Sequence, residues 1–403
     1  MKKILQSTTI TLVMLGGNHA VAGGLWLNEY GDFSGGRASA GATAGTDEAA
    51  TIIHNPASAT RIKGDQLFGA ASALITRVKF DVKESRPLLV GDGNGGQAGQ
   101  VTPGASMAYV FDNGWDKWST GISLAGLAGA GLNYNDDWVG RFQATEVNLL
   151  VMAMGGTVAY QVTDRLSIGV TPQIFYSTLT QKLRVPFVGA RAKLDGDDTG
   201  FGGAVGAMYD FNTGTRVGIS WQSSFDIKFD GKLKIDGNIG EGVQVSTDTQ
   251  LTMAQNVRLA LHHDVDDRLG LDFTVGWDNW DELDNIFVSV KDFGGAPIVT
   301  DWKDTYHYAA GFQYKLNDDW DITAGIAYDT NVVSANERVP ELPVDEQIRY
   351  NAGARYHLSN TLIVGGYLNY TDLGSAKIDA DFWSGKYSSN EMYQLSLYAN
   401  WML

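Results

Sequence analysis

The chain of 403 residues contains no cysteine. This absence excludes a disulfide-stabilised scaffold and any chemistry that needs a thiol. Beyond residue 22 the chain also lacks an uninterrupted apolar run of about 18 residues, the length that a membrane-spanning helix requires. If the protein sits in a bilayer, it must do so as a closed barrel, because only a closed barrel satisfies the backbone hydrogen bonds of strands in lipid.

Positive charge is scarce, since 30 lysines and arginines stand against 46 aspartates and glutamates, for a formal net charge of −16. This balance argues against nucleic acid as a partner. We expect no cofactor and no resident metal. His262 and His263 are adjacent in a strand and point to opposite faces, so they cannot share an ion. The glycine-rich stretch 91–96 is interpreted as a loop, with weak calcium binding as the alternative.

What the chain does have is strict alternation of apolar and polar residues with a period of two, which indicates strands with two unlike faces. Between Gln347 and Leu358, for example, Tyr350 and Tyr356 fall on one face and Arg349 and Arg355 on the other. A soluble sandwich can show the same pattern. Arginine, histidine, aspartate and lysine on the polar face suit a wet lumen better, and this favours a barrel whose apolar face meets lipid.

Composition agrees with this interpretation. Hydrophobic residues make up 44% of the chain and the mean hydropathy is −0.14, far from the values of a helical membrane protein. The 49 glycines, 11 tryptophans, 17 tyrosines and 16 phenylalanines fit strands with aromatic girdles at the two membrane interfaces.

The alternation predicts an all-β fold, a transmembrane antiparallel β-barrel of about fourteen strands. The predicted strands are 67–80, 103–112, 118–128, 146–161, 165–182, 200–211, 215–232, 248–263, 268–290, 302–316, 320–330, 346–358, 361–372 and 388–403. Short connections rich in turn residues alternate with long ones, near 81–102, 129–145, 183–199, 233–247, 291–301, 331–345 and 373–387. An even-stranded outer-membrane barrel predicts this rhythm, with short turns in the periplasm and long loops outside.

The residues before the first strand divide into two parts. Residues 1–22 begin with two lysines, continue through a moderately apolar stretch and end in Ala20-Val21-Ala22, which predicts a cleaved export signal. Residues 23–66 do not alternate, and they are too apolar at Trp26, Leu27 and Phe33 for a disordered tail. A barrel of fourteen strands is too wide for its own side chains to fill, so we expect 23–66 to be a plug inside residues 67–403.

Several segments resemble the FadL/TodX family of outer-membrane transporters of hydrophobic compounds. They are Gly24 to Tyr30, Gly36-Arg37-Ala38, Asp47-Glu48-Ala49, Asn55-Pro56-Ala57, Asn133 to Phe142, Trp302 to Tyr306, and Asp319 to Asp329. The resemblance implies a barrel stoppered by an N-terminal hatch. It also implies that ligand binds between the outer loops, moves to a pocket beside the hatch, and leaves through a gap in the wall at a kink in the third strand, against the Asn-Pro-Ala turn.

The candidate site residues follow from this resemblance and from the chemistry of the cargo. The substrate-binding candidates are Leu25, Trp26, Leu27 and Phe187 as apolar contacts, and Lys303 and Arg141 as partners for a carboxylate. The hatch and gate candidates are Asn55, Pro56, Ala57, Gly126, Gly129 and Gly131. Closely spaced glycines weaken strand pairing and permit a bulge.

The predicted function is passive transport of hydrophobic compounds, foremost long-chain fatty acids, across the outer membrane of a Gram-negative bacterium. An uptake channel for aromatic hydrocarbons and a general porin remain as alternatives, and an outer-membrane enzyme or adhesion protein is disfavoured. The expected partners are the hydrophobic cargo, outer-membrane lipid and lipopolysaccharide, and we expect a monomer.

Overall fold

The computed structural model describes residues 26–46, 48–112, 114–186, 190–237, 240–283, 285–290, 294–299 and 302–403. The predicted export signal, residues 1–22, and the candidates Leu25 and Phe187 lie outside these residues. None of the helices in the described part of the chain is long and apolar enough to cross a membrane.

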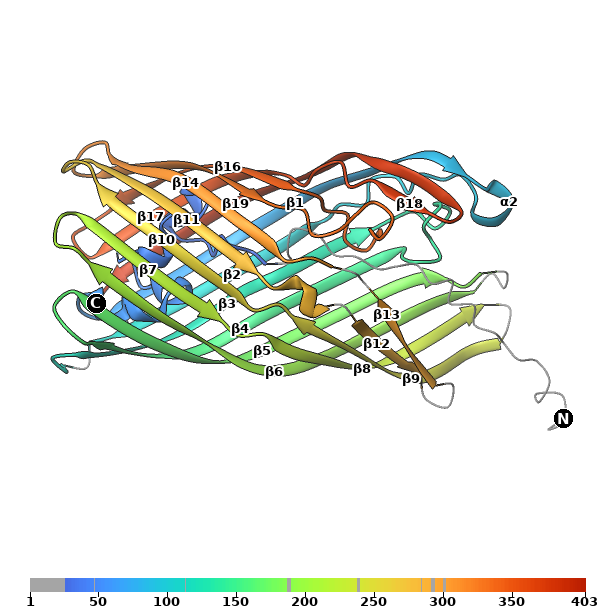
Figure 1. Ribbon diagram of the computed structural model, residues 1–403, viewed down its shortest axis with the longest axis horizontal. Helices are drawn as coiled ribbons and strands as arrows, with labels where there is room; N and C mark the ends of the chain where they lie inside the picture. The colour runs from blue at the N-terminus through green and yellow to red at the C-terminus, as the bar shows by residue number, and fades with distance from the viewer. Residues whose placement is uncertain are drawn as a thin grey trace.

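The strands form one antiparallel sheet that closes into a barrel of fourteen strands, as predicted (Figure 1). In order round the wall they are β1 (Gln66–Ser85), β2 (Val101–Phe111), β3 (Trp118–Asn133), β4 (Glu146–Gln161), β5 (Leu166–Arg184), β6 (Arg191–Asp210), β7 (Thr215–Gln222), β10 (Asn256–Asp264), β11 (Leu269–Asp278), β14 (Thr305–Lys315), β15 (Trp320–Asp329), β16 (Gln347–His357), β17 (Leu362–Asp372) and β19 (Trp383–Met402). The barrel closes because β19 pairs with β1 from Gln66↔Met402 to Ser85↔Trp383.

Five further strands lengthen or decorate the wall at the end with the long loops. β8 (Phe225–Gly237) and β9 (Gly240–Met253) prolong β7 and β10 as a hairpin, and β6 pairs with both β7 and β8. β12 (Asn285–Val290) pairs with β9 and with β13 (Gly294–Val299), and the short β18 (Ile378–Ala380) pairs with β19. The helix α2 (Pro87–Val90) lies in the first long loop, and the 3-10 helix η4 (Trp280–Leu283) separates β11 from β12.

Three predicted long loops are wrong. Residues 183–199 are mostly strand, because β5 runs to Arg184 and β6 begins at Arg191. Residues 233–247 and 291–301 likewise belong largely to the β8–β9 and β12–β13 hairpins. At the upper ends of β5 and β6 the outward residues are polar, as at Lys182 and Lys193, so the apolar-outward pattern that marked the other strands is missing.

The two faces of the wall are as predicted. Outward Tyr350 is 50% exposed, whereas its inward neighbours Arg349 and Asn351 are 3% and 5% exposed. In the last strand Leu397 and Trp401 are exposed and Ser396 and Asn400 are completely buried. The barrel therefore presents an apolar surface to lipid and a polar surface to its interior over this half of the wall.

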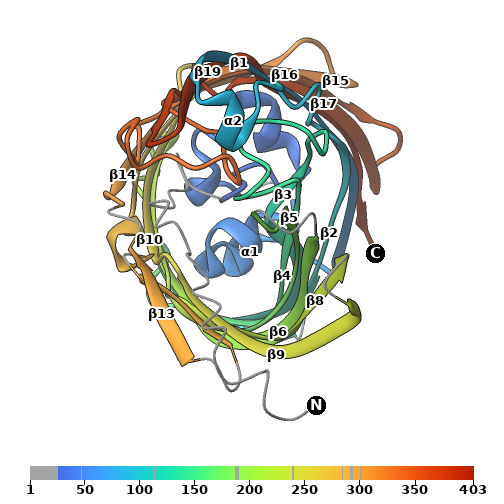
Figure 2. The ribbon, with the colours of Figure 1, turned by 90° about the vertical axis from the view of Figure 1, so that its right-hand side faces the viewer.

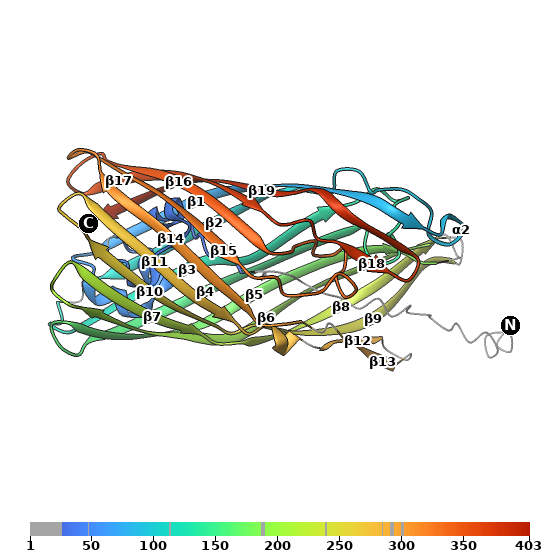
Figure 3. The same cartoon turned by 45° about the horizontal axis from the view of Figure 1, so that its top comes forward.

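The N-terminal residues lie inside the barrel. Residues 26–62, which we call the hatch, contain η1 (Phe33–Arg37), η2 (Ala42–Ala44), α1 (Thr51–His54) and η3 (Pro56–Arg61). Figure 2, a view from the end with the long loops, shows these turns lying inside the ring of strands. The hatch occupies the half of the barrel that is nearer to the C-terminus and the short turns (Figure 3).

Candidate functional site

A cluster of buried apolar side chains lies inside the barrel on the long-loop side of the hatch. We call it the lumenal cluster. Its buried members are Trp26, Ala125, Leu127, Ala128, Leu149, Val151, Ala153, Phe175, Phe225, Ile227, Phe229, Met253, Ala254, Trp280, Trp302, Val332, Val333, Val344 and Leu373. Most come from the hatch, from the inner faces of β3, β4, β5, β8 and β9, and from the loop 331–345, and the others are Ala254, Trp280 of η4, Trp302 and Leu373. An apolar lumen of this kind is a suitable environment for hydrocarbon.

Aromatic rings dominate the side of the lumenal cluster next to the hatch. Phe175 and Phe225 stack with ring centroids 3.6 Å apart. Trp26 lies 6.0 Å from Trp280, which makes an edge-to-face contact with Trp302 at 5.8 Å. Trp26, predicted as a cargo contact, is therefore the part of the hatch that closes the cluster from below.

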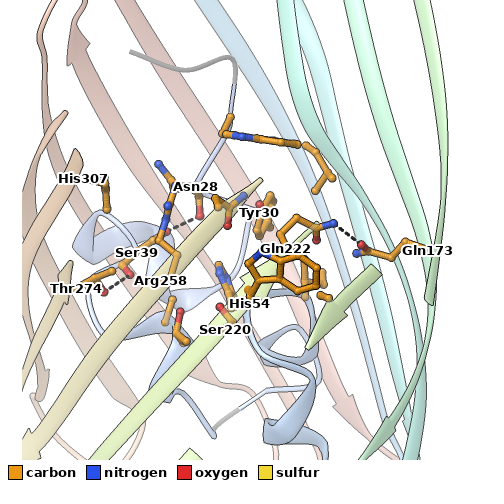
Figure 4. Close-up of a pocket in the computed structure, with 18 residues that line it drawn as sticks. Asn28, Tyr30, Ser39, His54, Gln173, Ser220, Gln222, Arg258, Thr274 and His307 are labelled. Carbon is orange, nitrogen blue, oxygen red and sulfur yellow. Dashed lines mark hydrogen bonds between the residues drawn. The ribbon is translucent and has the colours of Figure 1, made fainter. Parts of the chain in front are cut away.

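Directly beneath Trp26 the interior becomes polar. A small cavity of about 60 Å³ lies between the hatch and the wall, and amide, hydroxyl and imidazole groups line much of it (Figure 4). Gln222 donates to Gln173 Oε1 at 2.7 Å. The guanidinium of Arg258 is held by Asp278 Oδ1 at 2.8 Å and by Asn28 Oδ1 at 3.2 Å. Apolar and polar regions thus meet at Trp26.

Direct hydrogen bonds and buried ion pairs fasten the hatch to the wall. Arg37 Nε lies 3.1 Å from Asp272 Oδ2 on β11, and both side chains are almost completely buried. Gly41 N donates to Thr274 Oγ1 at 2.9 Å. Three strands further round the wall, Asn351 Nδ2 of β16 donates to Gly35 O at 2.6 Å. Breaking one partner of such buried pairs is costly, so the hatch is firmly seated.

The wall is interrupted between β2 and β3, beside the lumenal cluster. The β2–β3 ladder ends at Ser106↔Ala125, and the next bridge between the two segments is Gly99↔Leu132. We call the intervening part, residues 100–105 facing 126–131, the wall window. Within it β3 has a bulge between Gly126 and Ala128, at the place where the glycines predicted a kink.

The glycines of the wall window leave open space. A Cβ added at Gly126 would meet only Met152 Sδ at 3.6 Å, and one added at Gly129 would meet only Leu149 O at 3.6 Å. Both neighbours belong to β4 rather than β2. At the upper end the strands approach again, since a Cβ at Gly131 would lie 3.6 Å from Gln100 Cβ.

The hatch meets the inner side of the wall window directly. Trp26 forms an isolated bridge with Ala128, and Leu27 N donates to Leu127 O at 2.7 Å. The start of the hatch thus takes the place that β2 has left beside β3. Leu27 and the gate glycines therefore lie close together, and the inner side of the window is lined by members of the lumenal cluster.

The Asn-Pro-Ala turn lies elsewhere on the wall. Asn55 is completely buried and its Nδ2 donates to Thr43 O at 2.7 Å and to Ala207 O of β6 at 3.1 Å. Pro56 packs on Gly169 of β5, and a Cβ added at Gly206 of β6 would fall on Asn55 Oδ1. The turn therefore seats the hatch against β5 and β6, whereas the expected contact with the kink of β3 is made by Trp26 and Leu27.

The two predicted cations occupy different places. Lys303 is exposed, and its backbone N–H donates to Val332 O at 3.0 Å. Because Trp302 and Val332 are members of the lumenal cluster, Lys303 lies at its edge. Arg141 is in a long loop, where its Nη1 donates to Trp138 O at 2.9 Å and its guanidinium lies 4.4 Å from the Phe142 ring. Arg141 thus supports the loops.

The loops form a second apolar cluster over the mouth of the barrel. Its buried residues are Val78, Phe80, Val90, Ala98, Leu132, Tyr134, Trp138, Val139, Ala376, Ile378, Trp383 and Tyr387. The loop 331–345 runs beneath this cluster, where Tyr134 Oη donates to Pro340 O at 2.8 Å. Gln181 Nε2 donates to Glu341 Oε1 at 3.2 Å, and burial raises the pKa of Glu341 to about 7. The loop 331–345 is the roof of the lumenal cluster.

Sequence reasoning missed most of the lumenal cluster, including Phe175, Phe225 and Trp280. A signal was present, because Phe225, Ile227 and Phe229 alternate with Asp226 and Lys228. That alternation has the inward residues apolar, the reverse of the pattern in the later strands.

Comparison with known proteins agrees with this architecture. Residues 13–386 match the family model described as "Outer membrane protein transport protein (OMPP1/FadL/TodX)". The chain belongs to this family. Its members are outer-membrane channels rather than enzymes, and the protein is accordingly an outer-membrane transport protein of hydrophobic compounds.

Some relatives in the family are named as outer membrane proteins and others as long-chain fatty acid transport proteins. Outer membrane protein P1 of Haemophilus influenzae is 24% identical, with 94% of this chain and 92% of that protein covered. The long-chain fatty acid transport protein of Escherichia coli K12 is 23% identical, with 93% of each covered. Among solved structures, a Pseudomonas aeruginosa FadL homologue superposes with a TM-score of 0.84 at 18% identity, covering 94% of this chain and 99% of that one. The Pseudomonas putida toluene transporter TodX gives 0.72 at 17% identity, covering 94% and 99%.

Proposed function

We propose that the protein carries long-chain fatty acids passively across the outer membrane and releases them sideways through the wall window. The observation that carries this proposal is the interruption of the β2–β3 ladder beside the lumenal cluster. A hydrocarbon chain held in the cluster is separated from the lipid by the start of the hatch, Trp26 and Leu27, and by the glycines and the bulge of β3. It has no comparably apolar route past the polar cavity and the hatch.

The choice of fatty acids rests on the curated relatives and on the edge of the lumenal cluster. Several relatives are named as long-chain fatty acid transport proteins and align along most of this chain. A fatty acid has an apolar tail for the lumenal cluster and a carboxylate that a nearby lysine can bind. Lys303 is suitably placed, since it adjoins Trp302 and Val332. Trp26 and Leu27, with Leu25 before them, would contact the tail at the hatch.

Aromatic hydrocarbons are the second candidate cargo. The favouring observation is the set of rings at the base of the lumenal cluster, where Phe175 stacks on Phe225 and the tilted rings of Trp26 and Trp280 lie 6.0 Å apart. Two proteins of the same fold, TodX and TbuX, are named as toluene transporters. Uptake of labelled oleate and of labelled toluene in the same cells, which lack channels of their own, distinguishes the two cargoes.

A reversible crosslink across the wall window tests lateral release. Gln100→Cys with Gly131→Cys places two Cβ atoms about 3.6 Å apart, within the range of a disulfide. Because the chain contains no cysteine, this is the one disulfide that the variant can form. We expect the oxidised variant to take up oleate at least tenfold more slowly than the reduced one, with each single cysteine variant behaving as wild type.

A second variant tests the wall window without a disulfide crosslink. Gly129→Phe should fill the space next to β2 and slow oleate uptake. The matched control is Gly69→Phe on β1, an exposed position one strand beyond β2 where an added Cβ meets nothing within 4 Å. Unchanged uptake in both the oxidised double-cysteine protein and Gly129→Phe would refute lateral release.

A water-filled porin is the remaining alternative. The hatch fills the bore and is bonded to several strands (Figure 2). In a planar bilayer we expect the wild-type protein to show no steady ionic conductance comparable with that of a porin. Such a conductance would support the porin.

A further inference from the structure

Six basic residues gather on one part of the outer surface of the barrel, at the long-loop ends of β5, β6 and β8. They are Lys182, Arg184, Arg191, Lys193, Lys232 and Lys234, and we call this set the basic patch. Its members face outward. On β5 the alternate residues Phe175 and Leu179 pack into the lumenal cluster, so Lys182 and Arg184 point the other way. The remaining members share this face through the register of the strands.

The register brings like charges directly opposite one another. Lys182 pairs with Lys193 across β5 and β6, and Lys193 pairs with Lys234 across β6 and β8. One step further from the membrane Arg184 pairs with Arg191. Like charges in directly opposed positions destabilise a sheet. A row of three lysines followed by a pair of arginines, in a chain with a net charge of −16, therefore indicates a surface that meets an anion.

The basic patch lies above the level of the hydrocarbon. The last large apolar residues below it on the outer face are Tyr176 and Phe201, which are 47% and 73% exposed. Lys182 is six residues beyond Tyr176, and Lys193 is eight residues from Phe201. With a rise of about 3.3 Å per residue and a tilt of about 40°, the lysines stand about 15 to 20 Å higher along the membrane normal. This is the level of headgroups rather than of acyl chains.

Acidic side chains partly balance the patch. Glu146 lies 2.6 Å from Lys182 Nζ, Asp195 lies 2.6 Å from Lys193 Nζ, and Asp136 bridges Arg184, at 2.8 Å, and Arg191. Asp197 shares the face by register. Each ammonium group has three donors, however, and Lys182 and Lys193 remain 41% exposed. Lys232 and Lys234 are also exposed. Donors therefore remain for an external anion.

We propose that the basic patch binds the phosphate groups of lipopolysaccharide in the outer leaflet. The partner is a lipid whose acyl chains lie against the apolar wall around Tyr176 and Phe201 and whose phosphorylated sugars lie at the height of the lysines. Phosphate oxygens accept charge-assisted hydrogen bonds from several lysines at once, which removes the repulsion along the row. This site is independent of the cargo and of the wall window.

The test compares the wild-type protein with the triple variant Lys182→Gln, Lys193→Gln, Lys234→Gln. The proteins are purified in detergent and titrated with bisphosphorylated lipid A or with enzymatically dephosphorylated lipid A, and the bound lipid is counted by native mass spectrometry. We expect the triple variant to bind bisphosphorylated lipid A at least tenfold more weakly than wild type. Wild type should bind the dephosphorylated lipid as weakly as the variant does.

A matched control removes the same charge at the opposite end. Lys117→Gln, Arg165→Gln, Lys315→Gln lie in or beside the short turns, are all exposed, and should leave binding at the wild-type level. Equal binding by wild type and the patch variant would overturn the proposal. So would an equal loss in the control variant, because net charge alone would then explain it. Oleate uptake by both variants should match wild type, which confirms that they fold.

Discussion

The seating of Asn55 offers the most quantitative test of the hatch. Its side chain makes three buried hydrogen bonds: Nδ2 donates to Thr43 O at 2.7 Å and to Ala207 O at 3.1 Å, and Oδ1 accepts from Ala57 N at 3.0 Å. Asn55→Ala removes all three. At about 1 kcal/mol for each bond, the local stability of the hatch should fall by about 3 kcal/mol. That corresponds to a roughly 100-fold change in the opening equilibrium.

Hydrogen exchange in a native-like bilayer disc measures this change. Local opening free energies appear as protection of backbone amides, so amides of 48–62 should exchange about 100-fold faster in Asn55→Ala than in wild type. Amides of β15 and β16, on the far wall, should keep their protection. The matched control is Asn94→Ala, where an exposed side chain caps a loop turn and the hatch is not involved. Unchanged protection in residues 48–62 would contradict the structural assignment of Asn55.

A double-mutant cycle sharpens the test. Gly206→Ala alone should displace the hatch, because the new Cβ falls on Asn55 Oδ1. With Asn55→Ala also present, the closest remaining hatch atom is Pro56 Cδ, about 3.2 Å away. The double variant should therefore lose less protection than the sum of the single variants, by 1 kcal/mol or more, as expected for residues in contact. Additive losses would refute a direct contact between Asn55 and the β6 wall.

Three further predictions concern the lumenal cluster and its roof. Burial raises the pKa of Glu341 to about 7 from an ordinary value of 4.5. Between these pH values the folded loop holds a proton that the unfolded loop releases. The stability of the folded loop 331–345 should therefore fall as the pH rises from 4.5 to about 7. Glu341→Gln should abolish this dependence in the exchange rates of loop amides, corrected for intrinsic rates, and an unchanged dependence would exclude Glu341 as its source. Trp26→Ala should weaken oleate binding in a fluorescence competition assay by about tenfold or more, since a buried tryptophan contributes a large contact area, whereas exposed Trp115→Ala should not. Lys303→Gln should slow the uptake of oleate and leave that of toluene unchanged, and equal effects on both would remove Lys303 as a carboxylate partner.

The barrel could be predicted from sequence because its signal is local. Lipid outside and polar groups inside impose a period of two on each strand, and residues such as Tyr350 and Arg349 show it without reference to any other part of the chain. The same rule failed where the environment changed. Above the membrane β5 and β6 carry Lys182 and Lys193 on their outer face. The strands therefore continue there although the alternation of apolar and polar residues ends.

The site was only partly predictable because it is assembled from distant segments. The glycines at 126, 129 and 131 indicated a weak place in β3, yet nothing local could show that the residues of β2 before Ser106 do not pair with β3. Trp26 and Leu27, which bond to β3 where β2 does not, lie about a hundred residues earlier in the chain. Phe175, Phe225 and Trp280 meet only when three separate strand regions close into one barrel. Lys303 was found through the resemblance of its neighbourhood, and its place at the edge of the lumenal cluster rests on Val332, thirty residues later.

The contrast between the two halves of the lumen explains why cargo should leave sideways. Below Trp26 a hydrocarbon chain would have to pass buried polar groups such as Arg258 with Asp278 and Arg37 with Asp272. Losing an apolar environment costs about 0.8 kcal/mol per methylene, so a chain of about fifteen methylenes would face a penalty on the order of 10 kcal/mol on that axial route. On the proposed route through the wall window the same chain would pass from Leu127 and Ala128 into lipid and would keep an apolar environment. The firm seating of the hatch therefore favours the lateral route without any energy source, since the axial alternative is closed both sterically and by solvation.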